Sequence, residues 1–121
     1  MNILIIDGAN VVGSRPDGWW RDRPGAARRL AEGLAAVQLP YDEVVLVLEG
    51  AARRGRPAGQ QQGLRVQHAA GNGDDAIVAE VARQVAAGAE VDVVTADRGL
   101  RSRIQATGAT TLGPSWLLDQ L

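Results

Sequence analysis

The chain of 121 residues contains no cysteine, no lysine and no phenylalanine, and its only histidine is His68. The absence of cysteine excludes disulfides, thiolate metal sites and cysteine-protease chemistry. A single histidine makes a serine catalytic triad improbable, and we interpret His68 as structural. The 13 arginines nearly balance the 14 acidic residues. The molecule as a whole therefore has no strong field that would attract nucleic acid, although a local basic patch is compatible with this balance.

Long apolar runs are also missing. The first residues include only four consecutive aliphatic side chains and no basic segment before them. This pattern predicts neither a signal peptide nor a membrane span, so we expect a cytoplasmic protein without a membrane partner. The length predicts one domain, residues 1–121, which is large enough to bury about two-thirds of its unfolded surface.

Three short aliphatic runs end abruptly at an acidic residue. Residues 3–6 precede Asp7, residues 44–48 precede Glu49, and residues 91–96 precede Asp97. Runs of this length and apolarity are typical of buried parallel strands. Segments with helical spacing of apolar residues separate them. Strands that alternate with helices predict an α/β fold, a three-layer α/β/α sandwich around a central parallel sheet.

The remaining segments give weaker signals. Residues 11–23 are interpreted as a polar loop, and residues 50–63, which include three glutamines in a row, as a structureless loop. A loop of that length in a compact domain is usually functional or mobile. Residues 64–69 and 109–112 are predicted as further short strands.

The carboxyl ends of parallel strands meet at one edge of a sheet, where such folds place their ligand crevice. Asp7, Glu49 and Asp97 are therefore expected to converge there. Asp74 and Asp75 begin a helix and extend the acidic set. Carboxylates without nearby cysteine, histidine or lysine suit a hard divalent cation such as Mg²⁺ or Mn²⁺. Such an ion can activate a water and stabilise charge on a phosphate.

Each acidic residue also has a simpler interpretation when taken alone. Asp7 and Glu49 can serve as turn or loop residues before glycine. Either Asp74 or Asp75 can cap its helix, although a helix has one N-cap position. Asp97 can form an ion pair with the neighbouring Arg98.

Several polar and aromatic residues flank this edge. Asn10 can bind a water, a ligand or a carboxylate, and Thr95 can hydrogen-bond its own loop or contact a phosphate. Arg98 and Arg101 lie near the start of a helix, where backbone N–H groups also favour anions. The pair Trp19–Trp20 either packs or stacks on a nucleobase, and packing is the more frequent use.

Four motifs follow one another along the chain: Leu4-Ile5-Ile6-Asp7-Gly8-Ala9-Asn10, Val47-Leu48-Glu49-Gly50, Gly73-Asp74-Asp75-Ala76-Ile77 and Val94-Thr95-Ala96-Asp97-Arg98-Gly99-Leu100. In order and spacing they resemble the NYN (YacP-like) branch of the PIN-like nucleases, and the resemblance covers about residues 2–112. The resemblance implies a parallel sheet of strand order 3-2-1-4-5, a metal-dependent endoribonuclease activity and an acidic pocket at the carboxyl edge of the sheet.

By position, the resemblance implies that Asp7, Asp74 and Asp97 are metal-binding carboxylates. It also implies that Asn10 is their polar helper and that Thr95 lines the pocket. The chain departs from the family pattern at two positions. Glu49 stands where related domains often have aspartate, and Gly99 stands where they often have a further acid.

These observations predict a cytoplasmic ribonuclease that uses Mg²⁺ or Mn²⁺ and acts on RNA. Asp7, Asp74, Asp97 and Asn10 are the predicted catalytic residues, and Arg98, Arg101 and Thr95 are predicted to bind substrate. Glu49 or Asp75 is predicted to add a further contact to the metal through water.

Two other functions are alternatives: a PIN-like module that binds RNA or protein without cleavage, and the toxin of a toxin–antitoxin pair. A homodimer is one assembly that the sequence leaves open.

Overall fold

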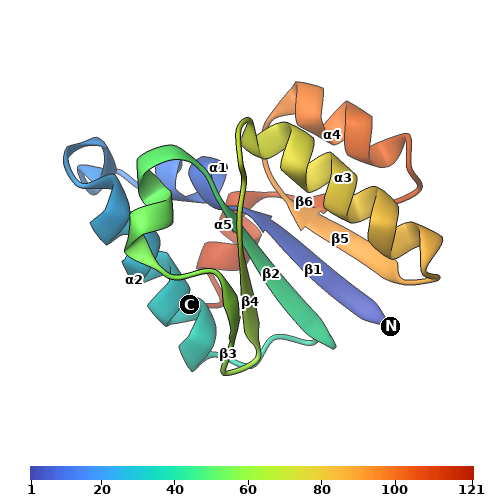
Figure 1. The fold of residues 1–121 in the computed structure, drawn as a ribbon, viewed down its shortest axis with the longest axis horizontal. Helices are drawn as coiled ribbons and strands as arrows, with labels where there is room; N and C mark the ends of the chain where they lie inside the picture. The colour runs from blue at the N-terminus through green and yellow to red at the C-terminus, as the bar shows by residue number, and fades with distance from the viewer.

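The elements alternate along the chain as the sequence predicts, in a computed structural model that describes residues 1–121 (Figure 1). The strands are β1 (Asn2–Asp7), β2 (Glu43–Leu48), β3 (Gly59–Gln61), β4 (Leu64–His68), β5 (Glu90–Val94) and β6 (Thr110–Leu112). The α-helices are α1 (Gly8–Gly13), α2 (Arg23–Ala36), α3 (Gly73–Ala86), α4 (Arg98–Gln105) and α5 (Pro114–Leu118). Two 3₁₀ helices, η1 (Trp19–Arg21) and η2 (Gly50–Gly55), complete the list. None of the helices has the length and apolar character of a transmembrane segment.

The sheet has the strand order β3-β4-β2-β1-β5-β6, with β1 in its interior. β1 pairs in parallel with β2 and β5, β2 pairs in parallel with β4, and β5 pairs in parallel with β6. Counted over these five parallel strands, the order is the predicted 3-2-1-4-5. β3 pairs antiparallel with β4 at the edge, so the sheet is mixed rather than purely parallel.

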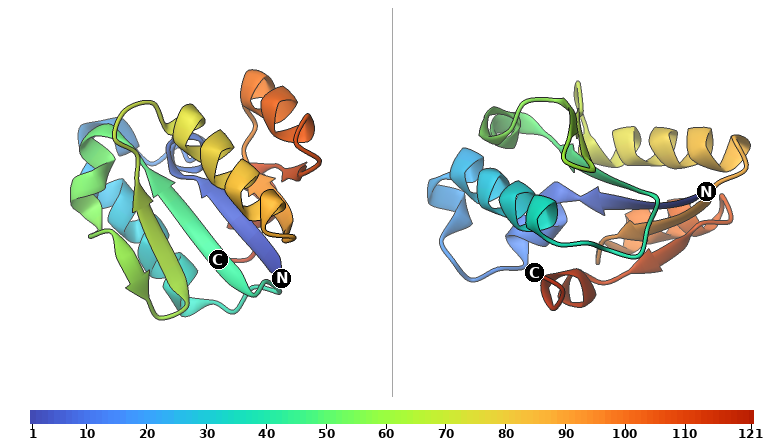
Figure 2. Two further views of the ribbon diagram at one scale, coloured as in Figure 1. Left: turned by 45° about the vertical axis from the view of Figure 1, so that its right-hand side comes forward. Right: turned by 90° about the horizontal axis from the view of Figure 1, so that it is seen from below.

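Alternate residues of each strand face opposite sides of the sheet, and each side has its own core. Leu4 and Ile6 of β1 pack toward α1, α2 and α5, whereas Ile3 and Ile5 pack toward α3 and α4. All four side chains are almost completely buried. Figure 2 shows the resulting three layers, with the sheet between the two groups of helices. The predicted three-layer α/β/α sandwich is thus confirmed.

Two segments predicted as loops contain regular structure. The predicted polar loop after β1 overlaps a helix, because α1 begins at Gly8 and continues to Gly13. Its N-cap is Asp7, whose side chain accepts the backbone N–H of Asn10, and Val11 and Val12 are buried. The prediction missed α1 because only two apolar residues mark its buried side.

The predicted loop over residues 50–63 forms η2 and then the strand β3. β3 turns back on β4 through Gln62 and Gly63, which both have positive φ (51° and 81°). Two consecutive residues with positive φ are typical of tight β-hairpins, where Asn-Gly is the usual pair. Because Gln-Gly is an unusual pair at this place, the hairpin could not be read from composition.

Candidate functional site

One small pocket at the carboxyl edge of the sheet gathers the predicted acidic residues. It has a volume of about 260 Å³. Its lining consists of Asp7, Ala9, Asn10, Glu49, Asp74 and Asp97. Asp7 ends β1, Glu49 follows β2, Asp97 lies after β5 and Asp74 lies in the first turn of α3, so segments that are distant in sequence meet here. No basic residue contributes to the lining.

Asp7 is the innermost of these carboxylates, and only 5% of the residue is exposed. Its Oδ1 accepts the backbone N–H of Asn10 (3.2 Å), and its Oδ2 accepts the hydroxyl of Thr95 (3.0 Å). Burial raises the pKa of Asp7, the two hydrogen bonds oppose this shift, and the charges of Asp74 and Glu49 add to it. The two hydrogen bonds therefore fix the orientation of the Asp7 side chain, while its burial disfavours the ionised carboxylate.

Thr95 lies in the interior of the protein, next to Asp7. Its side chain is fully buried, its hydroxyl donates to Asp7, and its Oγ1 accepts the backbone N–H of Asp97 (3.2 Å). It does not line the pocket. Contact of Thr95 with substrate stays a prediction; in the structure its hydroxyl orients Asp7 and the backbone of Asp97.

Asp97 caps α4, since its Oδ1 accepts the backbone N–H of Leu100 (2.8 Å). The alternative of an ion pair with Arg98 is not seen. A second carboxylate oxygen of Asp97 makes no hydrogen bond within the protein.

Asp74 and Asp75 point in different directions from the start of α3. Neither caps the helix, because Asn72 does so by accepting the backbone N–H of Asp74 (2.8 Å). Asp74 lines the pocket. Burial raises the pKa of Asp74, and Asp97 and Glu49 raise it further, while Arg103 partly offsets them.

Asp75 lies outside the pocket and pairs with Arg103 on α4 (2.9 Å). Its predicted contact with a metal through water stays a prediction, and in the structure its carboxylate is directed to the neighbouring helix. Consecutive residues at a helix start lie about 100° apart around the axis. The sequence could not decide which of the two faces the pocket.

Glu49 reaches the pocket from the end of β2. Its Oε2 accepts the backbone N–H of Gly73 at the start of α3 (2.8 Å). The position of Gly73 has no room for a side chain, because a Cβ there would lie 2.9 Å from Cδ of Glu49. The longer glutamate side chain is thus accommodated by a glycine on the facing helix.

Asn10 connects α1 to the loop after β5. Its Oδ1 accepts the backbone N–H of Ala96 (2.9 Å), and its own backbone N–H donates to Asp7. Asn10 therefore links Asp7 at the end of β1 to the loop after β5 that carries Asp97.

The donor chemistry of the pocket fits a hard divalent cation, since all its candidate ligands are carboxylate or amide oxygens. In the observed side-chain positions, however, no three carboxylates lie close enough together to hold one ion. Binding of a metal here would require the side chains of Glu49, Asp74 or Asp97 to move inward.

The two arginines that were predicted to bind substrate lie beside the pocket, not in its lining. Nε of Arg101 donates to the backbone carbonyl of Thr95 (2.7 Å), so this side chain supports the end of β5. Arg98 is exposed and forms neither an ion pair nor a side-chain hydrogen bond within the protein. Contact of either arginine with a phosphate stays a prediction.

A neighbouring cavity involves a residue that the sequence did not single out. Arg23, together with Trp19 and the start of η2, lines a cavity that adjoins the acidic pocket. The Trp19–Trp20 pair was the only signal in the sequence that pointed to this region.

Comparison with known proteins bears on the fold. No protein-family model matches the chain, and no curated protein matches its sequence. Among solved structures, the fold is similar to the crystal structure of Rae1 (YacP) from Bacillus subtilis, with a TM-score of 0.77 over 98% of this chain and 74% of that one. The chain has a YacP-like fold. The two sequences are 20% identical, so the similarity concerns the fold and not the chemistry of the pocket.

Proposed function

We propose that this protein is a metal-dependent endoribonuclease that hydrolyses RNA phosphodiester bonds with Mg²⁺ or Mn²⁺ as its cofactor. The observation that carries the proposal is the pocket that Asp7, Glu49, Asp74 and Asp97 line without any basic residue. The YacP-like fold and the resemblance of the four sequence motifs to the NYN branch of PIN-like nucleases support the same conclusion.

The proposed roles follow from the contacts of each side chain. Asp7, Asp74 and Asp97 would hold the ion directly, and Glu49 would contact it through water. When bound, such an ion supplies an activated water and stabilises charge on the attacked phosphate. Thr95 and the backbone N–H of Asn10 orient Asp7, and Gly73 orients Glu49.

Crowding of the carboxylates agrees with a site for a cation. Asp7 and Asp74 both have raised pKa values; burial is the largest cause, and neighbouring carboxylates contribute to both. Like charges that are held together resist ionisation unless a positive charge compensates them. The chain provides no such charge in the pocket, so an external cation is the natural partner.

Cleavage of labelled single-stranded RNA in Mn²⁺ and in EDTA tests the proposal. We expect wild-type protein to cut the RNA only with Mn²⁺ and Asp7→Asn to lose most of this activity. Asp74→Asn and Asp75→Asn form a matched pair, because the two residues are adjacent but only Asp74 lines the pocket. Equal activity in wild-type protein and Asp7→Asn would refute the assignment, and so would loss of activity in Asp75→Asn but not in Asp74→Asn.

A module that binds RNA or protein without cleavage is the second candidate. Two observations favour it: no three carboxylates are pre-arranged around one point, and Gly99 replaces a further acid. Calorimetric titration with Mn²⁺ separates the candidates, since a nuclease of this kind must bind the ion. Absence of binding at millimolar Mn²⁺, together with retained RNA binding, would favour the second candidate.

A further inference from the structure

A second cavity, of about 380 Å³, lies directly beside the acidic pocket and shares Ala9 and Glu49 with it. Its volume lies within the range of about 300–1,000 Å³ that is usual for sites of small organic ligands. Half of its lining residues are hydrophobic, whereas the acidic pocket is almost entirely polar. The two spaces are therefore adjacent, one half apolar and the other anionic.

Trp19 and Arg23 form one wall of this cavity. The guanidinium carbon of Arg23 lies 5.0 Å from the centre of the Trp19 ring, and the Arg23 side chain has no carboxylate partner. Trp19 is partly buried against the core, and the ring of Trp20 meets it edge-on at 5.9 Å. A supported aromatic ring beside a free guanidinium is the arrangement on which proteins stack unpaired nucleobases.

Small residues make up much of the remaining lining. Gly50, Ala51 and Ala52 of η2 line the cavity, and so does Gly8 at the start of α1. A Cβ at Gly8 would lie 2.5 Å from the carbonyl oxygen of Val47, so the backbone is already packed closely there. Because so many lining residues are small, the cavity keeps a volume of about 380 Å³, which is enough for a planar group.

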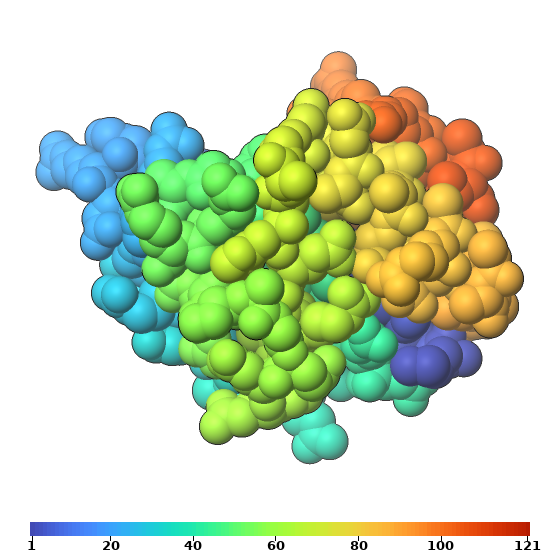
Figure 3. Space-filling model, in the orientation of Figure 1, coloured from blue at the N-terminus to red at the C-terminus, as the bar shows by residue number.

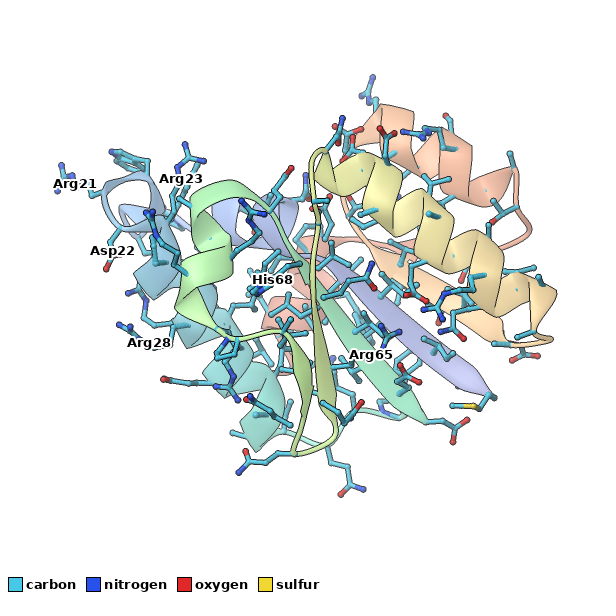
Figure 4. The ribbon with its side chains drawn as sticks, viewed as in Figure 1. Arg21, Asp22, Arg23, Arg28, Arg65 and His68 are labelled. Atoms are coloured by element: carbon cyan, nitrogen blue, oxygen red, sulfur yellow. The ribbon has the colours of Figure 1, made fainter.

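The segment that carries Trp19 and Arg23 lies at the surface, beside η2. Figure 3 shows the blue segment around η1 as a projection beside the green segment that contains η2. In Figure 4, Arg23 lies on the side of the η1 loop that is nearer to η2, whereas Arg21 lies on its outer side.

We propose that this cavity binds one unpaired nucleobase of single-stranded RNA, stacked on Trp19 and Arg23, next to the phosphate that occupies the acidic pocket. This inference rests on the proposed function, because that function supplies the RNA and places its phosphate. The shared residues Ala9 and Glu49 put the base site and the acidic site side by side, as a nucleotide requires. A base inside a duplex is paired and stacked and does not enter such a cavity, so the site selects single strands.

The chain offers a matched control in the next two residues of the same loop. Trp20 and Arg21 form a second pair of the same chemistry, with the guanidinium carbon 5.8 Å from the ring centre. Trp20 is 56% exposed, and neither residue lines either cavity. Trp19→Leu and Arg23→Gln should therefore weaken RNA binding, whereas Arg21→Gln, which leaves the contact between the two Trp rings in place, should not.

The experiment measures binding of a short fluorescein-labelled single-stranded RNA by fluorescence anisotropy, in EDTA and again with Ca²⁺. An abasic phosphodiester chain of the same length and the matching RNA duplex serve as ligand controls. We expect Trp19→Leu and Arg23→Gln each to weaken binding of the single strand by about fivefold or more, the effect of losing a base stack. Affinity for the abasic chain should stay unchanged.

The outcomes separate this inference from the proposed nuclease. Weaker single-strand binding in both variants, in a protein that never cleaves RNA, would support the base site and contradict the nuclease. Normal cleavage with an unchanged KM in both variants would support the nuclease and overturn the base site. Equal losses for the abasic chain would also overturn it, because they would indicate a phosphate contact. Arg23 is exposed, so Arg23→Gln remains informative if Trp19→Leu lowers the melting temperature.

Discussion

Thr95 donates its hydroxyl to Asp7, with 3.0 Å between Oγ1 and Oδ2, although 88 residues separate them in sequence. Both side chains are buried; Asp7 is the last residue of β1, and Thr95 directly follows the neighbouring strand β5. This bond opposes the rise in the pKa of Asp7 that burial causes. It therefore links the packing of the sheet directly to the ionisation of the innermost carboxylate.

Replacement of Thr95 by valine keeps the shape of the side chain and removes this hydroxyl. We expect Thr95→Val to lower the free energy of unfolding at pH 7 by about 1–3 kcal/mol, because Asp7 and the N–H of Asp97 lose a partner in a buried place. Thr95→Ser retains the hydroxyl and is the control. Urea unfolding of both variants checks the prediction, and equal stability of the two would contradict it.

Much of the fold could be predicted because its signals are local. The aliphatic runs that end at Asp7, Glu49 and Asp97 are buried strands, and the order of the parallel strands agrees with the one that the resemblance to NYN domains implies. β3 was not predicted, because its residues Gly59–Gln61 have no apolar pattern and depend on β4 for their hydrogen bonds. A strand of this kind is defined by its partner rather than by its own sequence.

The site was predictable to the level of the sheet edge, but not to the level of each side chain. Asp74 lines the pocket whereas Asp75 pairs with Arg103, and only the rotation of α3 decides between them. The positions of Thr95 and Arg101 likewise depend on which neighbour satisfies each polar atom. Such contacts come from tertiary packing, which residue spacing alone does not encode.

Asp74→Asn should stabilise the metal-free protein at neutral pH. The pKa of Asp74 is raised in the folded state, so ionisation disfavours folding once the pH exceeds its value in the unfolded chain, about 3.9. The variant should therefore have a higher melting temperature than wild-type protein at pH 7 in EDTA, and the gain should shrink toward pH 3. The control Asp75→Asn should show no such gain, because it loses the ion pair with Arg103. A gain that is independent of pH would contradict this explanation.

Mn²⁺ should raise the melting temperature of wild-type protein, because a ligand that binds only the folded state stabilises it. We expect the increase to be clearly smaller in Asp7→Asn and Asp74→Asn, which lose proposed ligands. Differential scanning fluorimetry over a range of Mn²⁺ concentrations checks this. Equal shifts in all three proteins would place the ion outside the acidic pocket.

Gly73→Ala should displace Glu49 while every carboxylate of the pocket is retained. The added Cβ would lie within 3.0 Å of the Glu49 carboxylate, which must then move away from the N–H of Gly73. We expect weaker Mn²⁺ binding by calorimetry, and no further loss when Glu49→Gln is added, because residues that act together are not additive. Gly71→Ala is the control, since a Cβ there meets no atom within 4 Å. Fully additive losses in the double variant would contradict the coupling.

Glu80 gives the chain an acid-sensitive contribution to stability that is independent of the pocket. It is 3% exposed and contacts Arg83, Gln84 (3.0 Å) and Arg65 (3.3 Å). Burial would raise the pKa of Glu80, but the hydrogen bonds from Arg83 and Gln84 and the charges of Arg65 and Arg83 outweigh it and lower the value. Its stabilising effect is therefore complete above the pKa of the unfolded chain, about 4.3, and is lost as the pH falls through the lower folded value.

Glu80→Gln removes this carboxylate and should lower the free energy of unfolding at pH 7 by about 1–3 kcal/mol, as expected for a hydrogen-bonded charge. Urea unfolding between pH 7 and pH 2 should reveal a difference from wild-type protein that narrows below about pH 4. Asp7 and Asp74 have raised pKa values and act with the opposite sign, but they are common to both proteins and cancel in the difference. Glu90→Gln, at an exposed residue without an ion pair, is the control. A difference for Glu80→Gln that stays constant from pH 7 to pH 2 would mean that the packing of Glu80 matters and its charge does not.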